Sequence, residues 1–220
     1  DERGDGRRMT GGRLAACFLD SLSSLNLPAM GCTIRYEYGL FRQKIVDGQQ
    51  VELPDNWLDN GNVWEMPVME DACEVHFNGY VDQVTENGVQ KFIHRDYHTV
   101  EAVPYDMPIV GYDTATVNSL RMWSARSPKH IDLTAFGQGR YVEASEEKEL
   151  AEVISKVLYP EDNNYEGKRL RLKQHYFFTS ATLQYILKDS SGCTARTSAC
   201  CRRRWLFISM TPILAWPFPS

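Results

Sequence analysis

The residues with the clearest capacity for chemistry lie in one stretch, from Tyr159 to Gly167, followed by a helical pattern that continues to Leu187. Its first part combines proline with acidic, amide and glycine residues, which favour turns, so we expect a polar loop. The helical part begins with four basic side chains, at Lys168, Arg169, Arg171 and Lys173. An acidic loop before a basic helix suits an anionic, hydroxyl-rich ligand. A solvated helix face beside an ordinary surface loop explains the same charges, so charge alone leaves both interpretations open.

Apolar periodicity predicts the helices that would position this loop. After Gly167, apolar side chains recur at steps of three, four or seven, which indicates one buried helix face. That face comprises Leu172, Tyr176, Leu183 and Leu187, widened by Phe177, Ala181 and Ile186. An earlier helix follows the glycines at 11 and 12 and is stopped by Pro28. Its predicted buried face comprises Leu14, Cys17, Phe18, Leu22 and Leu25.

Gly12 completes the glycine pair directly before that earlier helix. Backbone N–H groups are free at a helix start, where they can bind phosphate, so Gly12 is a candidate phosphate contact. Glycine before a helix is also a common turn, and the pair is a weak signal when it stands alone.

The middle of the chain predicts strands. Residues 31–39 alternate apolar and polar side chains, as a strand with one buried face does. The segment from Cys73 to Val103 predicts antiparallel strands, with Asn87-Gly88 as a two-residue hairpin turn. The fold class is therefore α/β with an antiparallel β excursion from about Cys73 to Val103.

The segment that leads back to the acidic loop predicts mixed structure. Residues 104–112 contain two prolines and two glycine or aspartate turn signals, which favour a loop, and residues 117–125 favour a strand. A further helix is expected to begin at Ser145, because serine caps helix starts and acidic residues follow it. Pro160 ends that helix.

Three other side chains invite a functional interpretation. Trp57 and Trp64 lie among carboxylates and amides, where an indole can stack on a sugar or pack between parts of the fold, and packing is favoured. Arg121 is flanked by apolar residues, which predicts a buried ion pair rather than a catalytic role.

Histidine and cysteine usage predicts no metal. His76, His94 and His98 fall on neighbouring predicted strands and could bind a metal, but no Asp, Glu or Cys pattern completes a site, so structural roles are favoured. None of the 6 cysteines forms a Cys-x-x-Cys pair, which argues against a zinc site and a disulfide framework. Reduced thiols in the cytoplasm are therefore expected.

The composition limits the function classes. The chain has 220 residues, of which 43% are hydrophobic and 24% charged, and this balance is that of a soluble globular protein. A formal net charge of −5 argues against nucleic acid as the main partner. No signal peptide and no apolar run of spanning length is visible, so we expect no membrane association.

The acidic loop and its helix carry a family resemblance. Leu158-Tyr159-Pro160, Asp162-Asn163, Glu166-Gly167-Lys168 and residues 170–174 closely resemble the α-glucan phosphorylases, which act on glycogen, starch or maltodextrin. Residues 13–21, 104–112 and 118–125 also match patterns of that family. The resemblance covers roughly residues 12–187. It divides the chain into a mobile, divergent segment (1–10), a partial N-terminal lobe (11–188) and an irregular tail (189–220).

The resemblance implies a fold and an activity. The fold would be part of the first lobe of a two-lobed, GT-B-like glycosyltransferase with nucleotide-fold-like halves. The activity would be phosphorolysis, in which inorganic phosphate attacks the non-reducing end of an α-1,4-glucan and releases glucose 1-phosphate with retained configuration. The family is allosteric and cytoplasmic, forms homodimers, and uses pyridoxal phosphate bound to a lysine of the second lobe. That lysine is absent from this chain, so the chain alone is expected to be inactive.

The resemblance also implies site residues. Asp162 and Asn163 lie in the loop that gates the catalytic cleft of the family, where they would bond sugar hydroxyls and control access. Glu161 stands where the family commonly has asparagine, and Gly12 is the one glycine retained from a phosphate-approaching loop. A different class of function is also open: a non-catalytic chain that binds glucan or associates with intact subunits.

The tail suggests a change of reading frame. Residues 189–220 carry three cysteines and three consecutive arginines without helical or strand periodicity. Read one frame away, the codons behind residues 205–219 permit Ile-Asn-Asp-Thr-His-Pro, which resembles the family segment expected there. We therefore hypothesise a frameshift between Leu187 and Trp205, which codons that forbid the alternate reading would refute. An interpretation of the arginines as a nucleic-acid patch is disfavoured.

Overall fold

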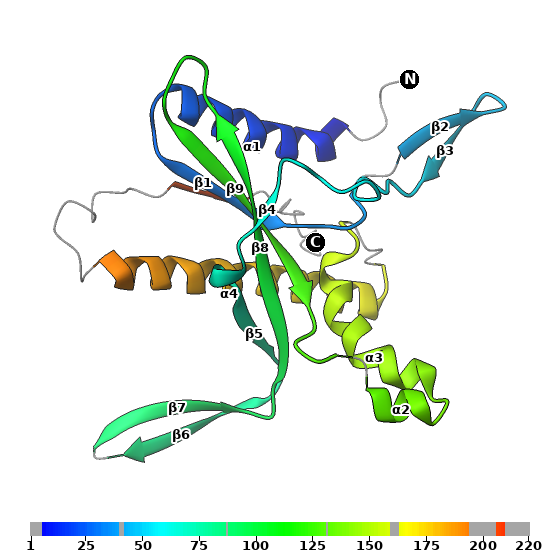
Figure 1. The fold of residues 1–220 in the computed structure, drawn as a ribbon, viewed down its shortest axis with the longest axis vertical. Helices are drawn as coiled ribbons and strands as arrows, with labels where there is room; N and C mark the ends of the chain where they lie inside the picture. Colours follow the sequence, from blue (N-terminus) through cyan, green and yellow to red (C-terminus); the bar gives the residue numbers. More distant parts are fainter. Residues whose placement is uncertain are drawn as a thin grey trace, which may run out of the picture.

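The computed structural model describes residues 6–39, 42–86, 88–130, 132–158, 163–193 and 206–209, with residues 6–13, 89, 189–193 and 206–209 described by their backbone alone. Figure 1 shows the arrangement of the helices and strands. The elements in chain order are α1 (Gly6–Ser24), β1 (Ala29–Ile34), β2 (Arg42–Val46), β3 (Gln49–Leu53), β4 (Met66–Pro67), η1 (Met69–Asp71), β5 (Cys73–Phe77), β6 (Tyr80–Glu86), β7 (Val89–Arg95), β8 (His98–Val110), β9 (Val117–Arg126), α2 (Leu133–Gly137), α3 (Tyr141–Glu152), η2 (Val153–Ser155), α4 (Tyr165–Cys193) and β10 (Leu206–Ser209).

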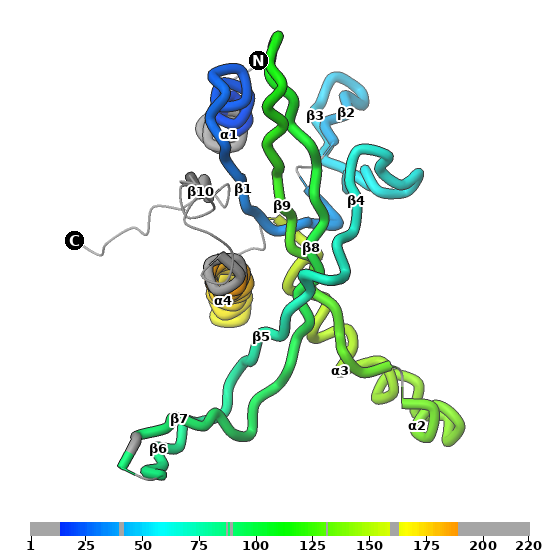
Figure 2. The backbone as a smooth tube through the Cα atoms, turned by 60° about the vertical axis from the view of Figure 1, so that its left-hand side comes forward, coloured from blue at the N-terminus to red at the C-terminus, as the bar shows by residue number. Residues whose placement is uncertain are grey.

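The main sheet is mixed and has the order β10-β1-β9-β8-β4, with β5 also paired to β8. β1 pairs in parallel with both β9 and β10, whereas β8 pairs antiparallel with β9 over ten residue pairs. Figure 2 shows α1 and α4 on the same side of this sheet. The sheet and these helices confirm the predicted mixed α/β class, since parallel strands require covering helices.

The antiparallel excursion is present as predicted. β5 pairs with β8, and β6 pairs with β7 as a separate two-stranded sheet that projects away from the main sheet (Figure 1). Gly88, in the predicted turn, has a φ of +78°, which glycine adopts readily. The second hairpin, β2–β3, turns at Asp47 and Gly48, both with positive φ.

The loop predicted for residues 104–112 is wrong up to Val110, because β8 runs continuously through Pro104 and Pro108. Pro104 is fully buried, and its carbonyl accepts a hydrogen bond from Val68 on the side of the strand away from β9. Along β8, the pairing with β5 ends at Ala102 and the pairing with β4 begins at Tyr105. Pro104 lies between the two, so its missing N–H breaks no hydrogen bond of the ladder.

α1 packs against β1, β8 and β9, but through a different face from the predicted one. Ala15, Leu19 and Ser23 are buried, whereas Leu14 and Phe18 are half-exposed. Small residues decide this choice, because they let the helix approach the sheet closely. A Cβ at Gly31 would lie 2.7 Å from Leu19, and a Cβ at Gly111 only 2.4 Å from the backbone of Ser23.

α4 also buries a face other than the predicted one. Phe177 and Ala181 are fully buried as expected, but the four residues that defined the stripe are exposed. In their place the buried face carries polar side chains, of which Gln174 is completely buried. The exposed residues are Leu172, Tyr176, Leu183 and Leu187. We call these four residues the outer stripe of α4.

Other boundaries differ from the sequence prediction. α3 begins at Tyr141, and Ser145 lies in its interior, where its Oγ is 3.2 Å from the carbonyl of Val142. The capping residue of this helical pair is Asp132, whose side chain accepts hydrogen bonds from the first N–H groups of α2. α1 begins at Gly6 rather than after Gly12, and the tail contains β10 along the edge of β1.

Arg121 forms the buried ion pair predicted for it. Its guanidinium lies 2.7 Å from both carboxylate oxygens of Asp106 and 2.9 Å from Asp71, and it stacks on the ring of Tyr185. Burial alone would lower its pKa, but hydrogen bonding and attraction to Asp106 outweigh burial and raise it. The cluster joins β8, β9 and η1 to α4.

Burial has the opposite effect on two core thiols. Burial raises the pKa of Cys32 to about 12 and that of Cys73 to about 11, because the charged thiolate is poorly solvated there. Cys17, on α1, is exposed.

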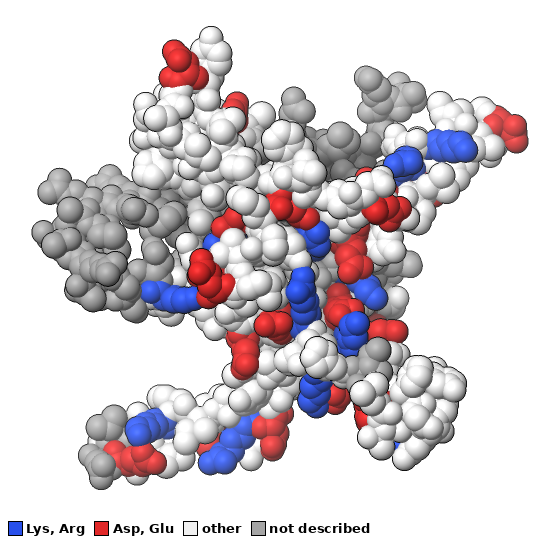
Figure 3. All heavy atoms as spheres, in the orientation of Figure 1, with Lys and Arg blue, Asp and Glu red and all other residues white. Residues whose placement is uncertain are grey.

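On the face drawn in Figure 3, basic and acidic side chains are interspersed across the centre of the molecule. Among the described residues, no helix has the length and apolar character that crossing a bilayer requires.

Candidate functional site

The predicted acidic loop is held at both ends by α4. Residues 159–162, which include Glu161 and Asp162, lie outside the described residues, and Asn163 is exposed at the point where description resumes. The loop therefore has to be understood from its two stems: residues 154–158 before it and residues 164–167 after it. We call residues 159–163 the 159–163 loop.

The first stem is fixed by two polar side chains of α4. The amide nitrogen of Gln174 donates to the carbonyls of Ile154 (3.1 Å) and Val157 (2.9 Å). Nη1 of Arg171 donates to the carbonyl of Leu158 (3.1 Å) and to Oε1 of Gln174 (3.1 Å). Both side chains are buried, at 7% exposure for Arg171 and 0% for Gln174, so these bonds are shielded from water. They hold the backbone up to the residue that precedes the loop.

The second stem is fixed by the start of α4. Oδ1 of Asn164 accepts a hydrogen bond from the N–H of Gly167 (2.7 Å), which makes Asn164 the capping residue of the helix. Glu166 lies in the first turn, where its charge complements the helix dipole, and it is 3.7 Å from Arg169. The helix therefore begins two residues before Gly167, earlier than the sequence predicted.

The four basic residues at this helix start do not act together. Lys168 and Arg169 are exposed, whereas Arg171 is buried against the first stem. Desolvation and the charge of Arg169 lower the pKa of Lys173, and desolvation and Arg171 lower the pKa of His175. Lys168 and Arg169 therefore belong to a solvated helix face. Arg171 has a structural role that could not be deduced from the number of basic residues.

Sequence reasoning also missed Gln174 and Asn164. Gln174 belongs to the block of residues that resembles the family and Asn164 does not, but neither residue type signals a ligand. The available signal was positional: Arg171 and Gln174 interrupt the apolar pattern of a helix, and a buried polar residue requires a partner.

Gly12 lies inside α1 rather than in a loop before it. In the interior of an α-helix the backbone N–H is bonded to the carbonyl four residues earlier, so it is not free for a phosphate. The free N–H groups of α1 belong to its first turn, near Gly6.

Among the other candidates Trp64 is 70% exposed, so the packing predicted for it is wrong, whereas Trp57 and two histidines have structural contacts. The indole N–H of Trp57 donates to the carbonyl of Tyr36 (3.0 Å), so Trp57 packs within the fold as favoured. His76 stacks on Tyr97 with ring centroids 3.8 Å apart, and Nε2 of His94 lies 2.7 Å from the carbonyl of Asn78. The part of the chain that the structure describes contains no group of three or more His, Cys, Asp or Glu residues suited to a metal.

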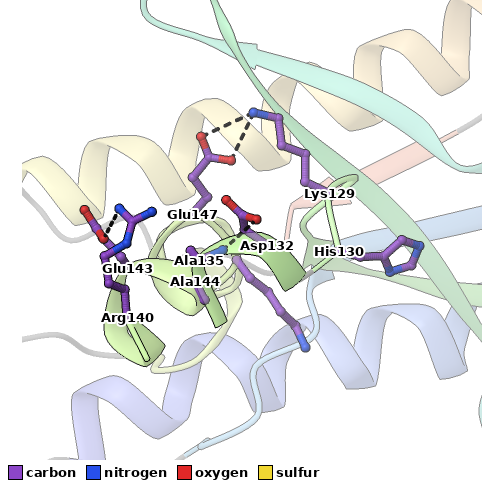
Figure 4. Close-up of a pocket in the computed structure, with 9 residues that line it drawn as sticks. Lys129, His130, Asp132, Ala135, Arg140, Glu143, Ala144 and Glu147 are labelled. Atoms are coloured by element: carbon purple, nitrogen blue, oxygen red, sulfur yellow. Dashed lines mark hydrogen bonds and ion pairs between the residues drawn. The ribbon is translucent and has the colours of Figure 1, made fainter. Parts of the chain in front are cut away.

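A surface hollow of about 480 Å³ lies between α2 and α3. In Figure 4, Lys129 points toward Glu147 and Arg140 toward Glu143. These pairs lie at 3.0 Å and 2.7 Å, and Asp132 is committed to capping α2. Because its charged groups satisfy one another, this hollow offers few free contacts to a ligand.

The described residues thus form a mixed α/β protein in which hydrogen bonds made by α4 fix the backbone on both sides of residues 159–162. Comparison with known proteins identifies the family. The family model described as carbohydrate phosphorylase matches residues 4–205, so the chain belongs to the carbohydrate phosphorylase family. The match extends beyond residues 12–187 on both sides.

Individual relatives agree. The chain is 50% identical over 193 residues to the brain form of glycogen phosphorylase from Rattus norvegicus, a match that covers 86% of the chain and 23% of the relative. It is 53% identical to the liver form from Ovis aries and 54% identical to the liver form from Homo sapiens, each over 177 residues, 80% of the chain and 20% of the relative. The chain spans about a fifth of the length of these relatives.

Proposed function

We propose that this chain supplies the substrate gate of an α-1,4-glucan phosphorylase. In the complete reaction, inorganic phosphate displaces the terminal glucose unit at the non-reducing end of the glucan. The bond to the next sugar breaks, and glucose 1-phosphate leaves with retained configuration. Family membership and the names of the relatives support this reaction.

One observation carries the gate assignment: the 159–163 loop is polar, while both of its stems are fixed. A loop with rigid stems can place its side chains reproducibly without being packed into the core. In this proposal Asp162 and Asn163 bond sugar hydroxyls and control entry, and Glu161 makes the first contact in place of an amide. A phosphate contact at Gly12 would require α1 to begin later than Gly6.

Pyridoxal phosphate is proposed for the family reaction rather than for the described part of this chain. When bound to a lysine outside this chain, the cofactor would supply a phosphate group for acid–base chemistry. In the hollow between α2 and α3 the candidate lysines are Lys129 and Lys148, which are paired with Glu147 and Glu152, respectively. These residues do not fit the cofactor, so no step is assigned to it here. A cytoplasmic homodimer is the expected setting of the whole family protein.

Glucan binding tests the gate directly. We expect the purified chain to bind maltopentaose in a calorimetric titration and Asn163→Ala to weaken that binding, because an exposed amide that bonds sugar hydroxyls is removed. Gln43→Ala, an exposed amide on β2, is the matched control and should bind like the original chain. Equal affinities for Asn163→Ala and the control would contradict the gate assignment.

Catalysis is tested separately. Incubation of the chain with glycogen, inorganic phosphate and pyridoxal phosphate should yield no glucose 1-phosphate above a blank. Turnover would contradict the proposal that residues outside this chain are essential.

A further inference from the structure

A second hollow lies where the chain leaves β1. It has a volume of about 310 Å³ and is lined by Arg35, Glu37, Tyr38, Asn56, Leu58 and Asp59. We call it the Tyr38 pocket. Its volume is at the lower end of the range of about 300–1,000 Å³ typical of small-molecule sites, which suits one small ring rather than a large ligand.

The first wall of the Tyr38 pocket is an extended segment with firm backbone contacts. The N–H groups of Arg35, Glu37 and Tyr38 donate to the carbonyls of Trp123 (2.9 Å), Ser155 (3.0 Å) and Lys156 (2.8 Å), respectively. These three bonds attach the wall to β9 and to the first stem of the 159–163 loop.

The second wall is the turn at residues 56–61. The N–H of Asp59 donates to the carbonyl of Asn56 (3.2 Å), and the indole of Trp57 donates across to the carbonyl of Tyr36 (3.0 Å). The indole bond joins the two walls. The pocket therefore has walls that are held in place without a ligand, as binding sites usually have.

One polar side chain of the pocket, that of Arg35, is already bonded within the protein, and three others have no hydrogen bond or salt bridge in the described residues. Arg35 bonds both carboxylate oxygens of Glu65, at 3.0 Å and 2.5 Å, and lies 4.2 Å from the ring centre of Tyr105. Burial would lower the pKa of Arg35, but its bonds and attraction to Glu65 outweigh that effect and raise it. Arg35 is therefore held in place by Glu65 and forms the base of the pocket.

The uncommitted side chains are those of Glu37, Asn56 and Asp59. Within the described residues, the structure assigns none of these three side chains a hydrogen bond or a salt bridge, although Glu37 feels the charge of Arg35. Two carboxylates and an amide offer several acceptors and one donor group. Beside them Tyr38 is 40% exposed and presents an aromatic ring.

This combination selects a class of ligand. Two carboxylates against one neutralised arginine disfavour phosphate. The described residues hold no group of three or more His, Cys, Asp or Glu side chains that could bind a metal. A neutral ring that carries several hydroxyl donors and an apolar face for Tyr38 satisfies every element of the pocket, and a sugar has these properties.

The pocket is physically connected to the gate. Tyr38 forms a β-bridge with Val157, and its carbonyl accepts a hydrogen bond from the N–H of Leu158 (3.2 Å). Leu158 is the last described residue before the 159–163 loop. We propose that the Tyr38 pocket is a subsite that binds one glucose unit of an α-1,4-glucan beside the gate. This inference rests on the proposed function, because it takes the glucan as the ligand.

The test removes the free acceptors while leaving the backbone walls intact. The double variant is Asn56→Ala/Asp59→Ala. Both side chains are exposed in the original chain, so their removal should leave the fold unaffected. Loss of two hydrogen bonds, at roughly 1 kcal/mol per bond, should weaken maltopentaose binding by about thirtyfold. Glu147→Ala, in the larger hollow, is the control and should bind like the original chain.

The outcomes separate the two proposals. NMR shifts of Tyr38 and Asn56 on addition of maltopentaose would support the subsite, and shifts with inorganic phosphate alone would overturn it. If Asn163→Ala weakens binding and the double variant does not, the subsite is wrong and the gate stands. If only the double variant weakens binding, the gate is wrong and the subsite stands. Absence of maltopentaose binding by the original chain would overturn both.

Discussion

At the scale of single residues, buried charge is the feature with the largest expected effect on stability. Arg121 was predictable as an ion pair because apolar neighbours on both sides indicate a buried strand, and a buried guanidinium requires carboxylates. Its partners Asp106 and Asp71 were not predictable, since pairing depends on the register of β8 against β9 and on the position of η1.

Arg121→Met should lower the free energy of unfolding by about 3–5 kcal/mol, because Asp106 and Asp71 would remain half-buried without their cation. Urea denaturation followed by tryptophan fluorescence measures this loss. Arg42→Met is the matched control: Arg42 is exposed and 3.5 Å from Asp55, so its loss should cost about 0–1 kcal/mol. Similar losses for the two variants would contradict the assignment of a buried ion cluster.

At the scale of elements, α4 shows where apolar periodicity succeeds and where it fails. The existence of the helix and the burial of Phe177 and Ala181 could be predicted from the sequence. The buried face could not, because Gln174 and Arg171 are polar and gain their burial by bonding carbonyls of a distant segment. A periodicity argument assigns such residues to solvent. Pro104 led to the wrong loop prediction for a similar reason. Whether a strand residue has a pairing partner on one side depends on the tertiary structure and cannot be deduced from the local sequence.

Gln174→Leu should lower the free energy of unfolding by about 1–3 kcal/mol, since two buried carbonyls lose their donor. Amide exchange at residues 156–158 should also accelerate, because the first stem of the 159–163 loop loses its anchor. Gln184→Leu is the control: Gln184 is on the same helix but exposed, so exchange at the stem should not change. Unchanged exchange in Gln174→Leu would show that Arg171 and the backbone bonds to Glu37 and Tyr38 hold the stem without Gln174.

At the scale of the whole molecule, the predicted α/β class and antiparallel excursion are correct, and the assignment of apolar faces is only partly correct. On α1, Ala15 and Leu19 are buried while Leu14 and Phe18 are half-exposed. The sequence predicts which helices are amphipathic, but the small residues Gly31 and Gly111 decide which side approaches the sheet. At the site, residues 159–162 lie outside the described residues, so the polar loop stays a prediction. The exposed basic residues Lys168 and Arg169 were predictable, and the side chains that fix the two stems were not.

The outer stripe of α4 should make the isolated chain self-associate, since large exposed apolar patches promote association. Leu172→Lys combined with Leu183→Lys should reduce both concentration-dependent light scattering and binding of an apolar dye. The stability should stay within about 0.5 kcal/mol, as for most surface substitutions. Phe177→Ala, which empties a fully buried position of the same helix, should instead cost about 3–5 kcal/mol. Unchanged scattering in the double lysine variant would show that self-association occurs through a surface other than the outer stripe.

The buried thiol of Cys32 and the partly buried thiol of Cys73 have a further consequence for resistance to oxidation. With pKa values near 12 and 11, Cys32 and Cys73 are ionised in only roughly one molecule in ten thousand or fewer at neutral pH, and peroxide attacks the ionised form. The sheet interior should therefore survive oxidative stress without sulfenic acid or mixed disulfide formation at these positions, whereas Cys17 on the outside of α1 stays open to such damage.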